Sequence, residues 1–179
     1  MSREMRVLGD APAWKPVSTA SLVGVALFAT LLLVLYGRSE DGWVPVLDGA
    51  NLLIHEAGHP LVGILSNRLM VYGGTIFQLL FPALTAFHFA RQEDAPGTAA
   101  GVIWLGESLL NVARYMADAR PQVLPLVGGG EHDWTEIFSR WGVLHLDGRI
   151  AGFTRFMALV LILGAVAWLF RRWQQGDSK

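Results

Sequence analysis

The sequence predicts an all-α fold: a polytopic membrane helical bundle of four to five transmembrane or buried helices. The chain has 179 residues, of which 53% are hydrophobic and only 16% are charged, and its mean hydropathy is +0.40. These values are too apolar for a typical soluble domain. The apolar residues form long continuous runs instead of alternating with polar ones, which indicates helices and not the strands of a barrel.

Five apolar runs are expected to form the helices of one integral-membrane domain that spans residues 1–179. The first, at about 20–36, carries no charge and is long enough to cross most of a bilayer. Because no small-residue cleavage site follows it, we expect a retained helix and not a signal peptide. The other helices are expected at 46–65, 71–90, 98–117 and 150–170, with a polar loop at 118–149.

The charges at the two ends bear on topology and partners. Each end carries three Lys or Arg residues, so the positive-inside rule places both termini in the cytoplasm and implies an even number of crossings. Five full spans would break this rule, so either the helix at 46–65 is buried without crossing or the charge count misleads. The net charge of −1 gives no indication of nucleic acid as a partner. The expected partners are the lipid bilayer and a membrane protein or peptide substrate.

The helix expected at 46–65 carries the HExxH pattern typical of zinc metalloproteases, as His55-Glu56-Ala57-Gly58-His59. Residues i and i+4 lie on one face of a helix, so His55 and His59 can direct both imidazoles at one zinc ion. Glu56, beside the first ligand, can take a proton from a water molecule that the zinc activates. Pro60 cannot donate a backbone hydrogen bond, which predicts a kink near Glu56.

The pattern is short and also matches by chance in soluble proteins. Its place in an apolar helix changes this interpretation, because ionisable residues are costly to bury in a membrane and usually have a function there. Two His and one Glu within five residues need a compensating partner, and a divalent cation is the simplest one. There are no cysteines, so His, Asp or Glu must hold it. The sequence therefore predicts a Zn²⁺ site.

The third zinc ligand must come from elsewhere in the chain. We predict His132, in the glycine-rich stretch "GGGEHDW", because such a stretch can fold back close to a metal. The next residue, Asp133, is also a competent ligand, or it could orient a neighbouring His from the second coordination shell. Glu107 and Asp118, on the helix expected at 98–117 and just after it, are alternatives. Each could instead form an ion pair with an arginine.

Other polar residues in the apolar helices have less specific interpretations. Gln78 and Asn111 could position a substrate carbonyl or stabilise an oxyanion, or they could form hydrogen bonds between helices. Asp48 precedes the motif and resembles a helix N-cap. It is too far along the axis from His55 to share a zinc ion.

The segment "HEAGHPLVG" resembles the membrane-embedded zinc metalloproteases of the site-2 protease class. The ordered set "HEAGH", "GGTIFQLLFP", "WLGESLLN", "YMADAR" and "GGGEHDW" looks like a group of small bacterial integral-membrane proteins. The resemblance implies an all-helical fold, zinc at His55 and His59, Glu56 as base, and a bacterial inner membrane location. Site-2 proteases take an Asp ligand from an LDG motif well downstream. Here one LDG precedes the motif, and the other contains Asp147, which becomes a further candidate.

These observations lead to one main hypothesis, an intramembrane zinc metallohydrolase that is a peptidase for membrane-associated substrates. A zinc amidase or esterase acting on a lipid is a second hypothesis, because a bundle open to lipid would serve it equally. A non-catalytic metal-binding membrane protein is the third. It predicts that Glu56 tolerates substitution whereas His55 and His59 do not.

Overall fold

The computed structural model describes residues 14–127 and 131–176, and these residues form helices and no strands. The predicted all-α class is therefore confirmed. The helices are α1 (Thr19–Arg38), α2 (Leu47–Gly63), α3 (Met70–Arg91), α4 (Ala95–Ala117), α5 (Asp133–Arg140), the short 3₁₀-helix η1 (Leu144–Leu146) and α6 (Asp147–Gly176).

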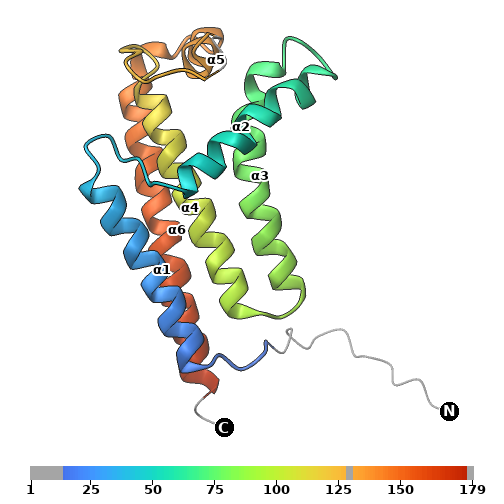
Figure 1. The fold of residues 1–179 in the computed structure, drawn as a ribbon, viewed down its shortest axis with the longest axis vertical. Helices are drawn as coiled ribbons and strands as arrows, with labels where there is room; N and C mark the ends of the chain where they lie inside the picture. Colours follow the sequence, from blue (N-terminus) through green and yellow to red (C-terminus); the bar gives the residue numbers. More distant parts are fainter. Residues whose placement is uncertain (1–13, 128–130, 177–179) are drawn as a thin grey trace, which may run out of the picture.

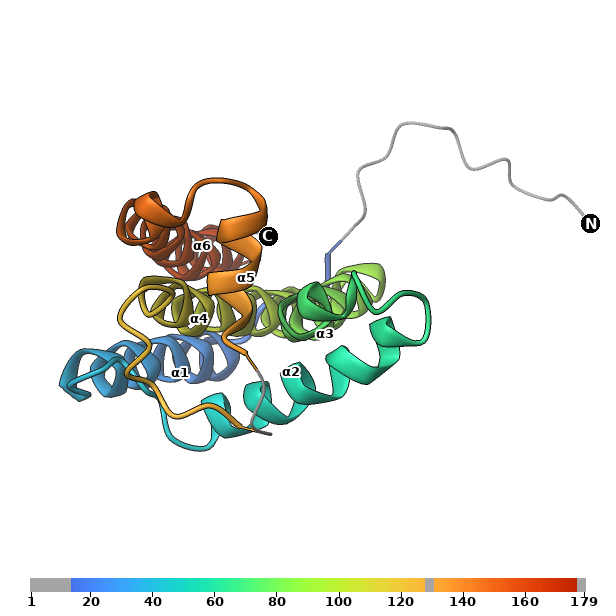
Figure 2. The ribbon, with the colours of Figure 1, turned by 90° about the horizontal axis from the view of Figure 1, so that it is seen from above.

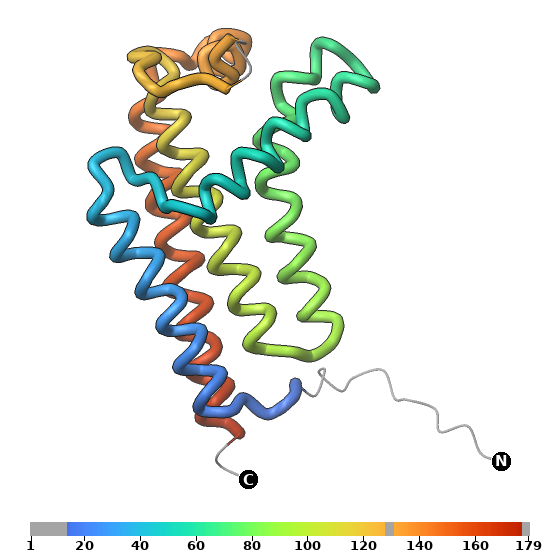
Figure 3. The backbone as a smooth tube through the Cα atoms, in the orientation of Figure 1, coloured from blue at the N-terminus to red at the C-terminus, as the bar shows by residue number. Residues whose placement is uncertain are grey.

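Four long helices, α1, α3, α4 and α6, form a bundle in which successive long helices run in opposite directions (Figure 1). Helix α4 lies at the centre and packs against α6, α3 and α1 (Figure 2). Helix α2 crosses the bundle obliquely and joins the upper end of α1 to the upper end of α3 (Figure 3). Helix α5 lies across the same end of the bundle (Figure 1).

Three of the described helical segments are long and apolar enough to cross a membrane: Thr19–Arg38, Met70–Arg91 and Leu144–Gly176. Central helix α4 is as long, but it carries Glu107 and Arg114, and its partners cover much of its surface. The predicted number of four to five transmembrane or buried helices is therefore confirmed only for these three spans. The start of α1 and the end of α6 lie at one end of the bundle, where the Trp173 indole donates to the Thr19 hydroxyl at 3.2 Å.

The predicted polar loop at 118–149 differs from the structure, because it contains α5, η1 and the first residues of α6. Helix α5 is short and strongly amphipathic. Its apolar residues Trp134, Ile137 and Phe138 are buried, and they pack with Val112 and Met116 of α4. The segment is polar on average, but one apolar stripe along α5 packs against the end of α4 and holds α5 there.

Helices α2 and α3 cross at two glycines, Gly58 and Gly73. A Cβ atom added to Gly58 would lie 2.3 Å from the carbonyl oxygen of Gly73, and one added to Gly73 would lie 2.4 Å from the carbonyl oxygen of Gly58. The two backbones therefore touch, as in the small-residue contacts of membrane helices. This contact brings the motif helix against α3. Helix α2 continues past Pro60 to Gly63 as one helix.

The start of α2 differs from the predicted N-cap at Asp48. The helix begins at Leu47, and the N-cap residue is Val46, which has a positive φ of 72° and makes no side-chain cap bond. Asp48 lies in the first turn and is fully buried. Its Oδ2 atom accepts a hydrogen bond from the Val44 backbone N–H at 2.6 Å.

Candidate metal site

The two motif histidines meet an aspartate from the other end of the chain. His55 and His59 project from α2, and Asp133 is the first residue of α5. The Asp133 Oδ2 atom lies 2.9 Å from His55 Nε2 and 3.2 Å from His59 Nε2. Ligand atoms of one tetrahedral zinc ion lie about 3.3 Å apart, as expected from metal–ligand bonds of about 2 Å. This buried His-His-Asp group could therefore hold a metal ion.

Hydrogen bonds to carbonyl oxygens orient both imidazoles. His55 Nδ1 lies 3.0 Å from the side-chain oxygen of Gln78, and His59 Nδ1 lies 2.9 Å from the backbone oxygen of Met70. Because a carbonyl oxygen only accepts, each Nδ1 must carry the proton. Each Nε2 is then the ring nitrogen that faces Asp133, to which it donates a proton in the absence of a metal ion and beside which it could bind one. Metal-binding histidines are usually oriented in this way by their second ring nitrogen.

The residues around His55 leave its ring little freedom. The Gln78 amide donates from Nε2 to the Asn111 side-chain oxygen at 2.9 Å, which fixes the oxygen that His55 contacts. On the same helix α3, a Cβ atom at Gly74 would lie 2.4 Å from His55 Nε2. Glycine at 74 is therefore the residue that lets α3 lie against the imidazole. Of the two roles that the sequence left open for Gln78, the structure shows hydrogen bonds between helices, one of which orients His55.

Electrostatics favour a positive charge between these side chains. Burial raises the pKa of Asp133, but hydrogen bonds to His55 and His59 outweigh this effect and lower it below its ordinary value. The hydrogen bond that His59 donates to Asp133 is also the main cause that raises the pKa of His59 to about 9. A metal ion must displace that proton, so its binding is coupled to proton release.

His132, the predicted third ligand, lies beside Asp133 in sequence but not in the group. It is the N-cap of α5, and its Nδ1 accepts from the Thr135 backbone N–H at 3.3 Å. Its Nε2 is turned to Asp118, 3.3 Å from Oδ2. The structure therefore brings Asp133, and not His132, to the motif histidines. The physical reason is that the capping geometry turns the His132 side chain back over the helix start.

The remaining candidate ligands are occupied elsewhere. Asp118 accepts from the backbone N–H groups of Val123 and Leu124 at 2.9 and 3.1 Å. Glu107 accepts from the Asn51 side chain at 2.8 Å. Asp147 receives two hydrogen bonds from the Arg120 guanidinium, at 2.7 and 2.8 Å. Neither Glu107 nor Asp118 pairs with Arg114, which instead forms an ion pair with Asp41.

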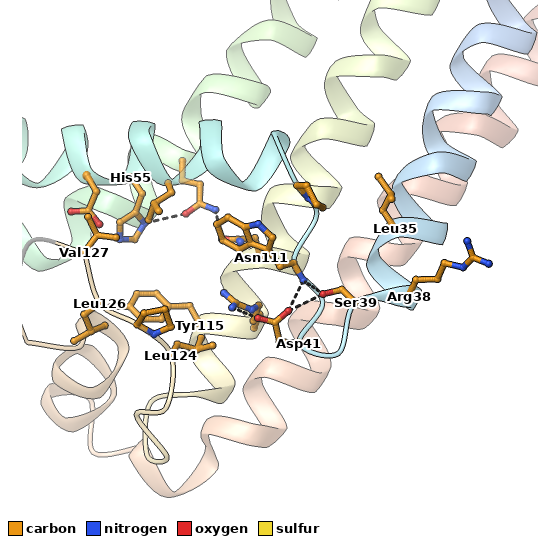
Figure 4. A pocket seen from close by; sticks show the side chains of 17 residues that line it. Leu35, Arg38, Ser39, Asp41, His55, Asn111, Tyr115, Leu124, Leu126 and Val127 are labelled. Carbon is orange, nitrogen blue, oxygen red and sulfur yellow. Dashed lines mark hydrogen bonds and ion pairs between the residues drawn. The ribbon is translucent and has the colours of Figure 1, made fainter.

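Two cavities flank the motif helix, with volumes of about 740 and 420 Å³. Glu56, Tyr115, Leu126 and Val127 line both cavities. Figure 4 shows the larger one, with His55 and Tyr115 on one side and Asp41 and Arg38 on the other. Glu56 thus stands where two spaces adjoin beside the histidines, which leaves room for a water molecule and a substrate.

The far side of the larger cavity carries a fixed ion pair. Arg114 on α4 pairs with Asp41 in the α1–α2 connection and lies 5.2 Å from the centre of the Trp43 ring. Hydrogen bonds from Arg114 and Ser39 lower the pKa of Asp41 to about 2. Asp41 is therefore ionised at any physiological pH, and the connection is held against α4.

Comparison of the chain with protein-family models, with curated proteins and with solved structures gave no match. The assignment of a function therefore depends on the geometry described above.

The orienting role of Gln78 leads to a prediction for metal affinity. Gln78→Leu removes the acceptor for His55 Nδ1 and should weaken zinc binding by about 10- to 100-fold, the usual effect of losing such a partner. Competition with a chromophoric chelator measures the affinity. Gln92→Leu, near the other end of α3, is the matched control and should bind zinc as the wild type does. Equal affinities for Gln78→Leu and the wild type would contradict this role.

Proposed function

We propose that this protein is an intramembrane zinc metallohydrolase, and specifically a peptidase. The observation that carries the proposal is the convergence of two Nε2 atoms on one carboxylate oxygen, with both Nδ1 atoms bonded to carbonyls. Three protein ligands leave one coordination position open, the arrangement of catalytic and not structural zinc sites. This supports a catalytic site more than the closed site of a purely structural metal.

The donor set together with Glu56 supports zinc as the metal. Two His and one carboxylate also suit non-heme Fe(II). A carboxylate one residue after the first ligand, lining the same cavities, favours zinc, because hydrolysis needs a general base whereas iron oxygenases need none at this place. When bound, the zinc ion would supply Lewis-acid chemistry and lower the pKa of water.

The chain's own residues supply the other requirements of hydrolysis. Glu56 takes the proton from the attacking water and then delivers it to the leaving group. The Tyr115 hydroxyl accepts a hydrogen bond from the Asp133 backbone N–H at 3.1 Å, so its own hydrogen remains available to an oxyanion in the cavity that Tyr115 lines. Desolvation raises the pKa of Tyr115 well above its ordinary value, so the hydroxyl keeps that hydrogen.

The shape of the site favours a peptide over a lipid ester or amide as substrate. Glu56 lines both cavities, so an extended chain that occupies both can place its central bond at the base. Residues 124–127, which form an irregular segment with bends at 124 and 127, border the larger cavity. Zinc-dependent cleavage of proteome-derived peptides by the purified protein tests this choice. Hydrolysis of phospholipid or acylated lipid, with no peptide cleaved, would overturn it in favour of the lipid enzyme.

Two adjacent residues give a direct test of the ligand set. Asp133→Ala should lose bound zinc, because two imidazoles without the carboxylate do not complete the site. His132→Ala removes a helix cap and the contact with Asp118 but no member of the His-His-Asp group, so it should keep one zinc per chain; the lost cap alone costs about 1 kcal/mol in stability. Metal content of the purified variants, measured by mass spectrometry, distinguishes them. Zinc retained by Asp133→Ala and lost from His132→Ala would reverse the assignment.

A further inference from the structure

A second buried polar group lies outside the metal site, where α2 meets α4. Asp48 in the first turn of α2 and Glu107 in the middle of α4 are 0% and 1% exposed. Glu107 reaches the buried face of α2 that carries Asp48, because its Oε2 accepts from the Nδ2 of Asn51, one turn after Asp48, at 2.8 Å, and the two carboxyl groups act directly on one another. Asp48 stands seven residues before His55, about 10 Å along the helix axis, so the pair does not touch the metal site. The proposed hydrolysis makes no use of it.

Each oxygen of Asp48 has a different environment. Oδ2 accepts from the Val44 backbone N–H at 2.6 Å. Oδ1 is buried and has no hydrogen-bond donor among the residues that the structure describes. A buried acceptor without a donor costs about 1–3 kcal/mol. Glu107 is the neighbouring group that can supply a donor to this oxygen, provided that it carries a proton.

Asn51 determines that Oε2 of Glu107 accepts a hydrogen bond. Its amide donates from Nδ2 to Glu107 Oε2 at 2.8 Å. Its carbonyl oxygen accepts from the Trp104 indole at 2.9 Å, and the Ser108 hydroxyl lies 3.4 Å away. The Asn51 amide therefore cannot be rotated without losing these bonds, and Glu107 Oε2 must act as an acceptor. One acceptor oxygen and one protonated oxygen are what a neutral carboxyl group offers.

The charges around the pair do not compensate two carboxylates. Arg114 is the cation that acts on Asp48, but it forms its ion pair with Asp41. The groups in direct contact with the pair, the Asn51 amide and the Val44 N–H, are neutral. Two carboxylates side by side in a buried site cannot both ionise, so such pairs hold one proton between them.

We propose that Asp48 and Glu107 share one proton, with Glu107 donating to Asp48 Oδ1, and that this bond anchors the motif helix to α4. Asp48, Asn51 and His55 lie on the buried face of α2. The shared proton thus holds in place the face of α2 that carries His55. Both residues are positioning residues, because they act through α2 and not on a substrate.

Infrared spectroscopy of the purified protein at neutral pH tests the shared proton. A protonated carboxyl gives a C=O stretching band that is absent from carboxylates and that shifts in heavy water. We expect both Glu107→Gln and Asp48→Asn to lose one such band, because either amide removes the need for the proton. Glu40→Gln, an exposed carboxyl in the α1–α2 connection, is the control and should keep the band. A wild-type spectrum without the band would overturn the proposal.

Thermal unfolding tests the anchoring. Glu107→Gln should unfold at or above the wild-type temperature, because its amide donates to Asp48 Oδ1 and accepts from Asn51 as a protonated Glu107 would. Glu107→Ala should unfold at a lower temperature by several degrees. A bound sodium ion could take the place of the shared proton, and choline is too large to replace it. If the infrared band is absent and the unfolding temperature falls when sodium is replaced by choline, a bound cation and not a shared proton joins the two residues, which would overturn the proposal. Neither measurement needs zinc or turnover, so failure of the proposed function leaves this test intact.

Discussion

Glu56→Gln should keep one zinc per chain and lose peptide cleavage by at least about 100-fold, the usual contribution of a general base. Glutamine has nearly the shape of glutamate and can fill the same place between the two cavities. It cannot accept a proton from water at neutral pH, so the attack step loses its base. The measurement is the initial rate of peptide cleavage by zinc-loaded wild type and variant, with metal content determined on the same samples.

Glu40→Gln is the matched control for this substitution. Glu40 is an exposed carboxylate in the α1–α2 connection that lines neither cavity, and the change removes the same charge without removing the base. We expect its cleavage rate to stay within about twofold of the wild type, since a single exposed charge contributes little. Equal rates for zinc-loaded Glu56→Gln and wild type would exclude Glu56 as the base and favour a non-catalytic metal-binding protein.

The two histidines of the candidate metal site, which lie on one helix, could be predicted from the sequence. The spacing of His55 and His59 is a property of one helix, so it directs both imidazoles to one side whatever the rest of the fold does. The cost of burying them in an apolar segment then indicated a cation. The structure keeps this helix and adds the carbonyl partners of each Nδ1 atom, Gln78 and Met70. The spacing of residues in the sequence does not identify Gln78 or Met70 as partners of the two histidines.

The third member of the candidate site could not be chosen from the sequence, because it depends on a contact across 78 positions of the chain. His132 and Asp133 are adjacent, and both are competent ligands by residue type. Their directions differ because α5 begins between them, so that one caps the helix and the other points from its first turn. The helix itself was missed, since only its stripe of Trp134, Ile137 and Phe138 is apolar. Its hydrophobic spacing was the available signal.

The number of membrane helices was uncertain for a related reason. Helix α4 has the length of a membrane span but carries Glu107, Asn111 and Arg114. Hydropathy averages a helix over all its faces, whereas α4 directs Glu107 and Asn111 at the buried Asn51 and Gln78. Its Arg114 pairs with Asp41, which is exposed. Length and composition alone therefore identify three spans. The arrangement of the bundle shows why a fourth long helix can be more polar.

Gly58→Ala should destabilise the protein by about 3 kcal/mol and weaken zinc binding, because overpacking at this crossing has no flexible neighbour to absorb it. The new Cβ atom would meet backbone atoms of Gly73 at 2.3 and 2.7 Å. Backbone cannot rotate away as a side chain does, so α2 must move from α3. His55 and His59 would then move with α2, while Asp133 stays on α5.

Gly49→Ala, on the same helix, separates this steric effect from the general effect of alanine. A Cβ atom there meets no other atom within 4 Å, and alanine is a better helix former than glycine by up to about 1 kcal/mol. We therefore expect unchanged or slightly higher stability and wild-type zinc affinity. Chemical unfolding in detergent and zinc competition measure both quantities. Equal behaviour of Gly58→Ala and Gly49→Ala would mean that the α2–α3 contact is looser than described and does not place the histidines.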